Sequence, residues 1–366
     1  MAGLRRGRPW QDQAFRCSFP SLDMKIALDA MGGDFAPKNN VEGAVLALKA
    51  SPEITKLFLV GDAVAIGKQL QRLGYQDERI EIYHASQVVQ MGESGPRAIR
   101  QKKDSSISRS VDLVKNGSAD ALVSAGHTGA TVAAAVLKLR TLPGIERPAV
   151  ACLLPTAKGE FLLIDAGANP DSKPVHLLQF GLMGAAFCEH ILGRTRPEVA
   201  LMSIGEEDMK GNDVTKETFK LLKGSGLNFR GNVEGNDLYE QPVDVVVCDG
   251  FTGNVILKTS ESIAYAIFGW LRRELNKGIL RKIGGKMASG AFRSIYQKIN
   301  AEEYGGMPLL GVNGTCIIAH GGSSAVAIKN AIGAATQAVR DNLTPRILQE
   351  IQSYNEKFAL AAAAGQ

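Results

Sequence analysis

The chain has 366 residues, of which 45% are hydrophobic and 22% are charged, and its formal net charge is +5. This composition is typical of an ordinary soluble globular protein with ample material for a core. The sequence has no run of about 18 apolar residues, which excludes a membrane-spanning helix. Its five cysteines are scattered without C-x-x-C spacing, a pattern that favours reduced thiols in a cytosolic core.

The first segment of the chain differs in kind from the rest. Residues 1–23 are rich in arginine and proline and have no apolar stretch of signal-peptide length, so we predict a disordered extension or an over-extended start. The first predicted strand begins at Met24. Because no Pro/Ser linker interrupts residues 24–340, we expect one α/β catalytic domain over 24–353, followed by a flexible tail over 354–366.

Strands and helices alternate along the remaining sequence. Apolar runs predict strands near residues 25–31, 57–61, 80–84, 121–125, 149–154, 161–166, 199–204 and 243–248. Helical periodicity predicts helices near residues 38–50, 62–73, 105–116, 130–140, 174–192, 213–224, 254–275, 280–299 and 324–353. This alternation predicts βαβ units, a largely parallel Rossmann-like sheet, and a three-layer α/β/α fold.

Five of the predicted strands end in polar, glycine-rich turns. These turns occupy residues 29–34, 124–130, 165–169, 203–207 and 248–254. Loops at the carboxyl ends of parallel strands share one edge of the sheet, which is where open α/β folds bind ligands. We therefore predict one shared crevice.

The turn after residues 243–247 is the most informative of the five. Here the Asp249-Gly250 turn leads into a long helix that we expect to begin near Asn254. A helix start leaves backbone N–H groups unpaired and carries partial positive charge, so a glycine-rich turn there accepts a phosphate readily.

Several familiar motifs are absent. The sequence has no dinucleotide-type G-x-G-x-x-G at the first helix, no Walker-type phosphate loop, no nucleophile elbow and no zinc-like histidine spacing. Cys248 ends a run of valines, so it is more often a core thiol than an acyl-enzyme nucleophile. The residues thus predict a phosphate-binding crevice without a cofactor, a metal or an obvious covalent nucleophile.

The same motifs, in this order, are similar to those of a known family. They read Asp29-Ala-Met-Gly-Gly-Asp34, Ser124-Ala-Gly-His-Thr-Gly-Ala130, Asp165-Ala-Gly-Ala-Asn169, Ser203-Ile-Gly-Glu-Glu207, Lys210-Gly-Asn212, Cys248-Asp-Gly-Phe-Thr-Gly-Asn254, Leu310-Gly-Val-Asn-Gly-Thr315 and His320-Gly321. Over roughly residues 24 to 350, the chain resembles the bacterial phosphate acyltransferase family, PlsX. Position 127 departs from the family, which often carries asparagine there.

The resemblance implies an acyl-[acyl-carrier-protein]:phosphate acyltransferase. Such an enzyme moves a long-chain fatty acyl group from the acyl carrier protein to inorganic phosphate, and the acyl phosphate then feeds a glycerol-3-phosphate acyltransferase at the start of phospholipid synthesis. The resemblance also implies the fold of phosphotransacetylases and isocitrate/isopropylmalate dehydrogenases. It further implies a cytoplasmic homodimer associated peripherally with the membrane.

This chemistry suits the crevice residues. Phosphate is a competent nucleophile and a thioester is already activated, so the enzyme must mainly position both and stabilise an oxyanion. We therefore predict catalytic roles for His127, Lys210 and Asn254. We predict a phosphate cradle made of Thr128, Gly129, Thr252 and Gly253. The alternatives are helix capping by His127, pairing of Lys210 with the neighbouring glutamates, and ordinary turn chemistry.

A second set of residues is expected to support the site. The strand-end aspartates repel phosphate, so orienting a histidine, a lysine or a loop amide suits them better than direct contact, and structural anchoring is an equal alternative. His320 is either a site residue or a turn residue. The full supporting set is Asp29, Asp34, Asp165, Asn169, Glu206, Asn212, Asp249 and His320.

The positive charge is concentrated near residues 270–300. This segment holds eight basic residues and one acid, a local charge of +7 against +5 for the whole chain. Apolar residues recur there at helical spacing, so we predict a basic amphipathic protrusion that contacts a membrane or the carrier protein. The basic residues are Arg272, Arg273, Lys277, Arg281, Lys282, Lys286, Arg293 and Lys298. The alternative is a dimer or core face, and Gly284, Gly285 and Gly290 favour a broken helix. Nucleic acid is not an expected partner, since interleaved aromatics are missing.

Two competing functions remain open on the sequence alone. One is a phosphotransacetylase-like enzyme that acts on coenzyme A thioesters with the same fold. The other is a catalytically silent scaffold at the membrane surface that gathers partners through residues 270–300, although it would not explain the many polar strand ends.

Overall fold

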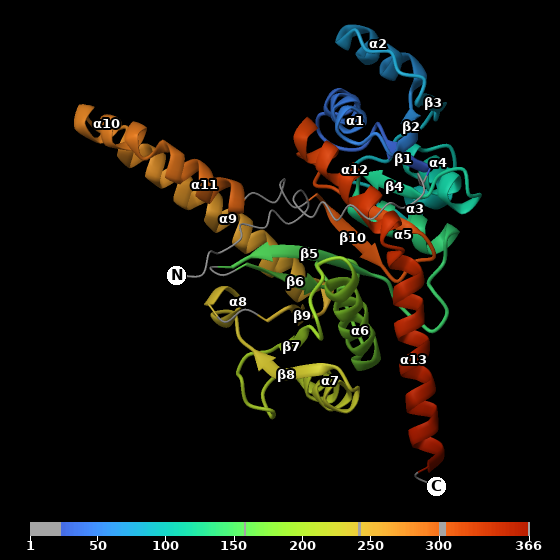
Figure 1. Ribbon diagram of the computed structural model, residues 1–366, viewed down its shortest axis with the longest axis vertical. Helices are drawn as coiled ribbons and strands as arrows, with labels where there is room; N and C mark the ends of the chain where they lie inside the picture. The colour runs from blue at the N-terminus through green and yellow to red at the C-terminus, as the bar shows by residue number, and fades with distance from the viewer. Residues whose placement is uncertain (1–22, 157–158, 241–242, 300–304, 365–366) are drawn as a thin grey trace.

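The computed structural model describes residues 23–156, 159–240, 243–299 and 305–364 (Figure 1). Apart from residue 23, the predicted extension over 1–23 lies outside the described residues. The sequence-based expectation of where the first strand starts is confirmed, because that strand begins at Met24.

The amino-terminal part of the chain builds the first half of the sheet. It contains β1 (Met24–Asp29), α1 (Lys38–Ala50), β2 (Ile54–Gly61), α2 (Ala63–Leu73), β3 (Ile80–His84), α3 (Gly95–Gln101), α4 (Ser106–Lys115), β4 (Ala121–Ser124) and α5 (Thr128–Lys138). The second half follows with β5 (Ala149–Pro155), β6 (Glu160–Ile164), α6 (Pro174–His190), β7 (Glu198–Met202), α7 (Asp213–Gly224), β8 (Asn228–Val233), α8 (Asp237–Glu240) and β9 (Val245–Val247).

The carboxyl-terminal part of the chain returns to both halves. It contains α9 (Gly250–Leu275), α10 (Ile279–Met287), α11 (Ser289–Ile299), β10 (Met307–Leu310), β11 (Thr315–Ile318), α12 (Ala325–Arg340) and α13 (Leu343–Ala364). The far part of α9, together with α10 and α11, extends away from the body of the molecule (Figure 1).

The described strands form one sheet of eleven in the order β3-β2-β1-β4-β11-β10-β5-β6-β9-β7-β8. Most neighbouring pairs are parallel, as the alternation of elements predicts. The pairs β11-β10, β10-β5 and β5-β6 are antiparallel. Three reversals in succession change the strand direction, so β6, β9, β7 and β8 run opposite to β1, β2, β3, β4 and β11.

Helices cover both faces of this sheet. Consecutive side chains of a strand point to opposite faces, and in the strands below they pack against different helices. In β4, Ala121 and Val123 pack in a core cluster with α1 and α12, whereas Leu122 packs with α4 and α5. In β6, Leu162 faces α6, whereas Leu163 joins a cluster that includes Leu257 of α9. The predicted three-layer α/β/α fold is therefore confirmed.

Several predicted boundaries were wrong. The helix expected over 280–299 is divided between α10 and α11, and the helix expected over 324–353 is divided between α12 and α13. The second division occurs where Asn342 takes the left-handed conformation, with φ of 53°. A residue in this conformation cannot continue an α-helix. The segment expected as a flexible tail over 354–366 is helical as far as Ala364, and its flexibility stays a prediction.

A second group of elements was missed. These elements are α3, α8, β8, β10 and β11, and all of them are short, between 4 and 7 residues. Gly231 in β8 has φ of 124°, and Pro308 lies within β10, so neither segment shows an uninterrupted strand pattern. Within the described part of the chain, no helix is long and apolar enough to span a membrane.

Candidate active site

The five glycine-rich strand ends form two groups. The carboxyl ends of β1, β4 and β11 lie at the same edge of the sheet, because these strands are parallel. The carboxyl ends of β6, β7 and β9 point the opposite way, because of the three antiparallel pairings. The expectation that all five turns lie at a single edge of the sheet was therefore wrong.

Asp29 anchors the first group. Its side chain is fully buried and accepts hydrogen bonds from Ser124 Oγ at 2.8 Å and from the N–H of Met31 at 3.2 Å. Burial raises the pKa of this carboxyl above its usual value. A Cβ atom on Gly32 would lie 2.5 Å from Asp29 Oδ2 and 2.6 Å from the nitrogen of Gly126. Asp29 thus sits beneath two glycine turns and holds them together.

His127 caps α5. Its Nδ1 accepts a hydrogen bond from the N–H of Ala130 at 3.2 Å, so the capping alternative is present in the structure. With Nδ1 as an acceptor, the neutral ring carries its proton on Nε2, and this N–H is available to a ligand. Thr128 and Gly129 form the first turn of α5. A Cβ atom on Gly95 would lie 2.5 Å from the carbonyl of Gly129, which brings α3 against this turn.

The turn after β11 joins the first group. The N–H of Asp34 donates to the carbonyl of Gly321 at 2.8 Å. His320 is exposed, and its Nδ1 accepts from the N–H of Gly322 at 3.1 Å. The loops after β1, β4 and β11 are therefore one packed unit.

Asp165 organises the second group. Its carboxylate accepts from the N–H groups of Val150 and Gly167, both at 3.0 Å. It also accepts from the N–H of Asn169 at 2.7 Å and from Asn169 Nδ2 at 2.8 Å. Burial raises the pKa of Asp165, and these donors act in the opposite sense. Asp165 and Asn169 therefore hold the loop after β6 in its conformation. This is the structural anchoring that the sequence left open as an alternative to a supporting role in the site.

The predicted phosphate turn is the first turn of α9. The helix begins at Gly250, not near Asn254, because Asp249 caps it. Asp249 accepts from the N–H of Thr252 at 2.9 Å and from Thr252 Oγ1 at 2.8 Å, so both donors of Thr252 are taken. Gly253 packs on the carbonyl of Asp165. Asn254 is exposed, and its side chain faces Gly167.

The loop after β7 carries Lys210. Its side chain is 52% exposed and its Nζ lies 4.0 Å from Glu207 Oε2, a contact too long to hold it firmly. Glu206 is exposed. Asn212 caps α7 by accepting from the N–H of Thr215 at 2.9 Å. The lysine is thus only loosely paired, and the asparagine has a structural role.

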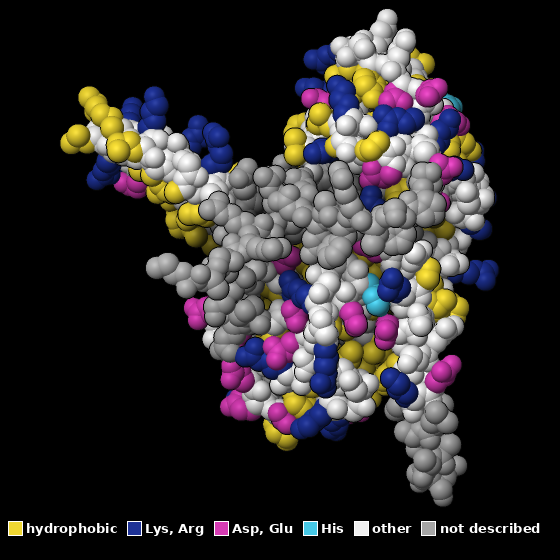
Figure 2. Space-filling view, viewed as in Figure 1, with side chains coloured by type: hydrophobic (Ala, Val, Ile, Leu, Met, Phe, Trp, Pro, Cys, Tyr) yellow, Lys and Arg dark blue, Asp and Glu magenta, His cyan; other side chains and the backbone are white. Residues whose placement is uncertain are grey.

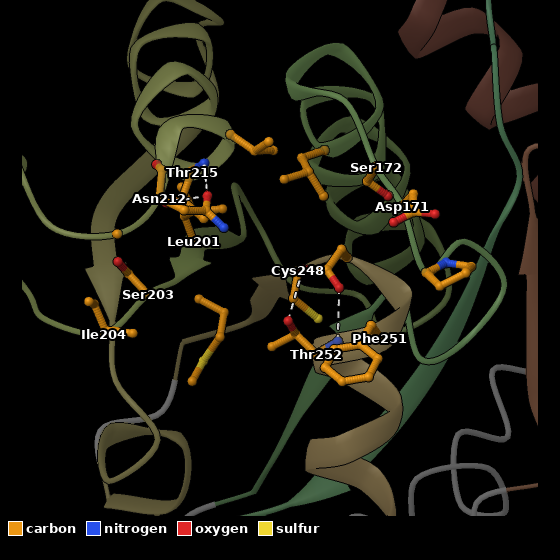
Figure 3. Close-up of a pocket in the computed structure, with 16 residues that line it drawn as sticks. Asp171, Ser172, Leu201, Ser203, Ile204, Asn212, Thr215, Cys248, Phe251 and Thr252 are labelled. Carbon is orange, nitrogen blue, oxygen red and sulfur yellow. Dashed lines mark hydrogen bonds between the residues drawn. The ribbon is translucent and has the colours of Figure 1, made fainter.

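A cavity of ≈ 760 Å³ opens between the carboxyl ends of β6, β7 and β9. The first turns of α7 and α9 face each other across it (Figure 3). Much of its wall is apolar and consists of Leu177, Leu201, Met202, Ile204, Val214 and Phe251. Polar groups reach the same wall from Ser172, Asn212, Thr215, Asp249 and Thr252. The cavity therefore combines helix starts with apolar surface.

Cys248 lines this cavity but has the surroundings of a core thiol. It is 3% exposed, and burial raises its pKa well above the usual value, with the charges of Asp165 and Asp249 adding to the effect. A nucleophilic cysteine needs a stabilised thiolate. The structure accordingly supports the core-thiol interpretation.

One helix connects the two groups. Because α9 begins at the second group and its Lys258 contacts His320 of the first, the helix leads from the second group toward the first. Lys258, one turn beyond Asn254, places its Nζ 3.3 Å from Nε2 of His320. Lys258 was not among the predicted site residues, although its i, i+4 spacing from Asn254 puts both on one helix face.

Comparison with known proteins identifies the family. The family model described as "Fatty acid synthesis protein" matches residues 24–346. A phosphate acyltransferase of Akkermansia muciniphila is 49% identical over 90% of this chain and 96% of its own length. One of Pelotomaculum thermopropionicum is 48% identical over 93% of this chain and 98% of its own length. The chain belongs to this family.

The predicted membership of the phosphate acyltransferase family is thus confirmed, and with it the expectation of an acyltransferase enzyme of fatty acid synthesis. Solved structures support the fold alone. A phosphotransacetylase from Streptococcus pyogenes has a TM-score of 0.55 at 20% identity and covers 90% of this chain and 94% of its own. The EutD phosphotransacetylase from Staphylococcus aureus has a TM-score of 0.54 at 18% identity, with 86% and 94% covered.

Proposed function

We propose that this member of the phosphate acyltransferase family transfers a long-chain fatty acyl group from acyl-[acyl-carrier-protein] to inorganic phosphate. The product is an acyl phosphate for phospholipid synthesis. One observation carries the proposal: a capped, glycine-containing helix start opens onto a ≈ 760 Å³ cavity with mostly apolar walls. A helix start suits phosphate, and apolar walls suit a fatty acyl chain.

The reaction needs no group beyond those of the chain. An oxygen of hydrogen phosphate attacks the thioester carbon and an oxyanion forms. As the oxyanion collapses, the carbon–sulfur bond breaks, and the carrier thiolate takes the proton that the phosphate gives up. We assign Lys210 and the Asn254 amide to the phosphate or the oxyanion, because Lys210 lies in the loop after β7 and Asn254 lies at the start of α9, both next to residues that line the cavity. His127 belongs to the first group of loops, and we assign its Nε2–H as a further donor to the phosphate or the oxyanion. Oriented donors of this kind stabilise charge that develops in the transition state.

The helical protrusion is the proposed surface for a membrane or for the carrier protein. Ile279, Leu280 and Met287 of α10 are exposed by 78%, 86% and 84%, and basic side chains flank them (Figure 2). Exposed basic residues of the protrusion are Arg272, Arg273, Lys277, Arg281, Lys282, Lys286 and Arg293. The Lys298 side chain lies outside the described residues. Apolar and basic side chains together suit an anionic lipid surface.

The remaining partners are also proposals. We propose a cytoplasmic, peripherally membrane-associated homodimer whose product passes to a glycerol-3-phosphate acyltransferase. The phosphotransacetylases that share the fold are at most 20% identical in the comparisons above, so they do not favour a coenzyme A substrate.

The test is thioester loss from palmitoyl-carrier protein with and without inorganic phosphate, with acyl phosphate followed directly. We expect loss that depends on phosphate and yields acyl phosphate in equal amount. Lys210→Ala and Asn254→Ala should slow it at least tenfold, whereas Lys220→Ala, an exposed lysine paired with Glu217 on α7, should not. No phosphate-dependent loss with active carrier protein overturns the proposal. Transfer from coenzyme A thioesters alone would support the competing enzyme.

A further inference from the structure

His320 and Lys258 face each other in an arrangement that lacks an acceptor. Lys258 Nζ lies 3.3 Å from His320 Nε2, and the N–H of Gly322 points at Nδ1 of the same ring at 3.1 Å. An ammonium group and a backbone N–H are both donors. The imidazole thus meets a donor at each of its two nitrogens.

Neither neutral tautomer satisfies both contacts. If Nδ1 accepts from Gly322, the ring proton is on Nε2, and Nε2–H faces the Lys258 ammonium donor to donor. If the proton is on Nδ1 instead, Nδ1–H faces the N–H of Gly322, and these two groups are both donors. The turn holds the Gly322 contact, so the open position is the one between Nε2–H and Nζ. Among the described residues, none offers His320 Nε2 an acceptor.

Lys258 is held in place on the helix that joins the two loop groups. Its Nζ donates to Glu261 Oε2 at 2.9 Å, which leaves two of its three N–H donors free. The neighbouring Leu257 packs in the same core cluster as Cys152 of β5 and Leu163 of β6, so this part of α9 lies over the middle of the sheet, where the strand direction changes. Asn254 is one turn away on the same helix face.

We propose that Lys258 and His320 bind one oxygen of the inorganic phosphate acceptor between Nζ and Nε2–H. Two converging donors, one of them a cation, match an anionic oxygen better than the neutral carbonyl of a thioester. The carboxylate of Asp34 approaches the Gly321–Gly322 turn but makes no hydrogen bond to His320. This inference rests on the proposed transfer to phosphate, and it assigns two residues to the acceptor.

The test separates the two substrates by kinetics. Lys258→Gln and His320→Ala should each raise KM for inorganic phosphate roughly tenfold or more, with KM for palmitoyl-carrier protein within about twofold of wild type. His320→Gln, which restores an N–H donor, should recover much of the loss. If both residues bind one oxygen, the double variant should raise the phosphate KM less than the product of the single effects.

Binding is also measured without turnover. Inorganic phosphate should raise the melting temperature of the wild-type protein, and Lys258→Gln should reduce this shift. Lys220→Gln is the control, because Lys220 also pairs with a glutamate three residues away but faces no histidine. Without phosphate, all variants should melt close to wild type, since both side chains are exposed.

The outcomes distinguish this inference from the proposed function. A phosphate-dependent wild-type enzyme whose phosphate KM is unchanged in Lys258→Gln and His320→Ala overturns the inference alone. A rise only in KM for the acyl donor also overturns it, because Lys258 and His320 would then bind the thioester and not the phosphate. A wild-type protein without phosphate-dependent transfer overturns the proposed function itself.

Discussion

Gly253 lies so close to the backbone carbonyl of Asp165 that a Cβ atom at position 253 would overlap with it. The first turn of α9 and the loop after β6 therefore touch backbone to backbone. The Asp165 carboxylate accepts hydrogen bonds from Asn169 and from several backbone amides, and these bonds fix the contact. Only glycine allows this approach of the helix start to the cavity group.

Gly253→Ala should displace the first turn of α9. We expect a loss of about 1–3 kcal/mol in the free energy of unfolding, which is the usual cost of overpacking, and a fall in activity of at least tenfold. Urea unfolding and acyl phosphate formation measure the two effects. Gly269→Ala on the same helix is the control. A Cβ atom there would meet nothing within 4 Å, so a gain of about 0.5–1 kcal/mol is expected. Equal effects of the two substitutions would contradict the account.

Two substitutions separate the capping role of His127 from its proposed role as a hydrogen-bond donor in the reaction. His127→Ala removes the side-chain acceptor of the Ala130 N–H and should cost about 1 kcal/mol of stability, together with at least tenfold in kcat/KM. His127→Asn supplies an oxygen for the cap and an N–H donor, so both quantities should stay near wild type. Thermal unfolding and initial rates provide the measurement. Retained stability with lost activity in His127→Asn would show that the imidazole itself is required.

Cys248→Ala should leave acyl transfer largely intact, because a buried thiol beside two carboxylates does not form a thiolate. A cost of about 1 kcal/mol in stability is expected from the small void. The control is Cys188→Ala, another buried thiol, which lies on the buried side of α6 in a core cluster. Loss of activity by a hundredfold or more in a folded Cys248→Ala protein, with no such loss in Cys188→Ala, would restore the covalent route.

Asp77 supplies a pH-dependent contribution to stability. Its hydrogen bonds to Arg79, at 3.0 Å and 2.7 Å, hold the pKa of Asp77 well below its usual value. Arg79 in turn donates to the carbonyls of Leu48 and Ile54, which ties α1 and β2 to the turn before β3. Because the folded-state pKa is lowered, this stabilisation is complete above the ordinary aspartate pKa. It declines as the pH falls from there toward the folded-state pKa.

Asp77→Asn should therefore cost about 1–2 kcal/mol at pH 7, and the difference from wild type should shrink at pH 3. Urea unfolding at both pH values measures it. Glu81→Gln breaks a more exposed ion pair with Lys56 and should change stability by less than about 1 kcal/mol. A deficit of Asp77→Asn that grows as the pH falls would be inconsistent with the lowered pKa.

The protrusion gives a prediction for lipid binding. Reversing two charges of α10, Lys282→Glu with Lys286→Glu, should weaken binding to vesicles of anionic lipid at least tenfold, since each basic residue near such a surface contributes about 1 kcal/mol. Co-sedimentation with anionic and neutral vesicles measures it. Acyl transfer in solution should be unchanged if lipid is the partner of this surface, whereas a raised KM for palmitoyl-carrier protein would assign the surface to the carrier protein. Equal binding of the variant and the wild type to anionic vesicles would remove lipid as the partner.

Local sequence determines much of this fold, and the local units were predictable. The helices over 38–50 and 213–224 have the predicted boundaries, since their apolar periodicity is regular and the second has a clear cap at Asn212. The glycine turns that follow β4 and β9 also lie at helix starts, as expected. These features depend on residues that are close in sequence.

The relation between the two loop groups was not predictable in this way. It depends on the pairing of β10 with β5, whose partners Leu309 and Val150 are far apart in the chain. Four-residue strands such as β10 and β11 are too short to show a period. Lys258 was overlooked for the same reason, because its contact with His320 spans 62 residues and exists only once α9 crosses the sheet.

Helix α9 has a mechanical consequence. It runs without a break from Gly250 to Leu275, a rod of about 39 Å at 1.5 Å per residue. Its first turn borders the cavity, whereas its last turn carries the protrusion (Figure 1). If a surface binds the protrusion as proposed, it therefore also fixes the orientation of the cavity relative to that surface, because the helix holds the two at a constant distance.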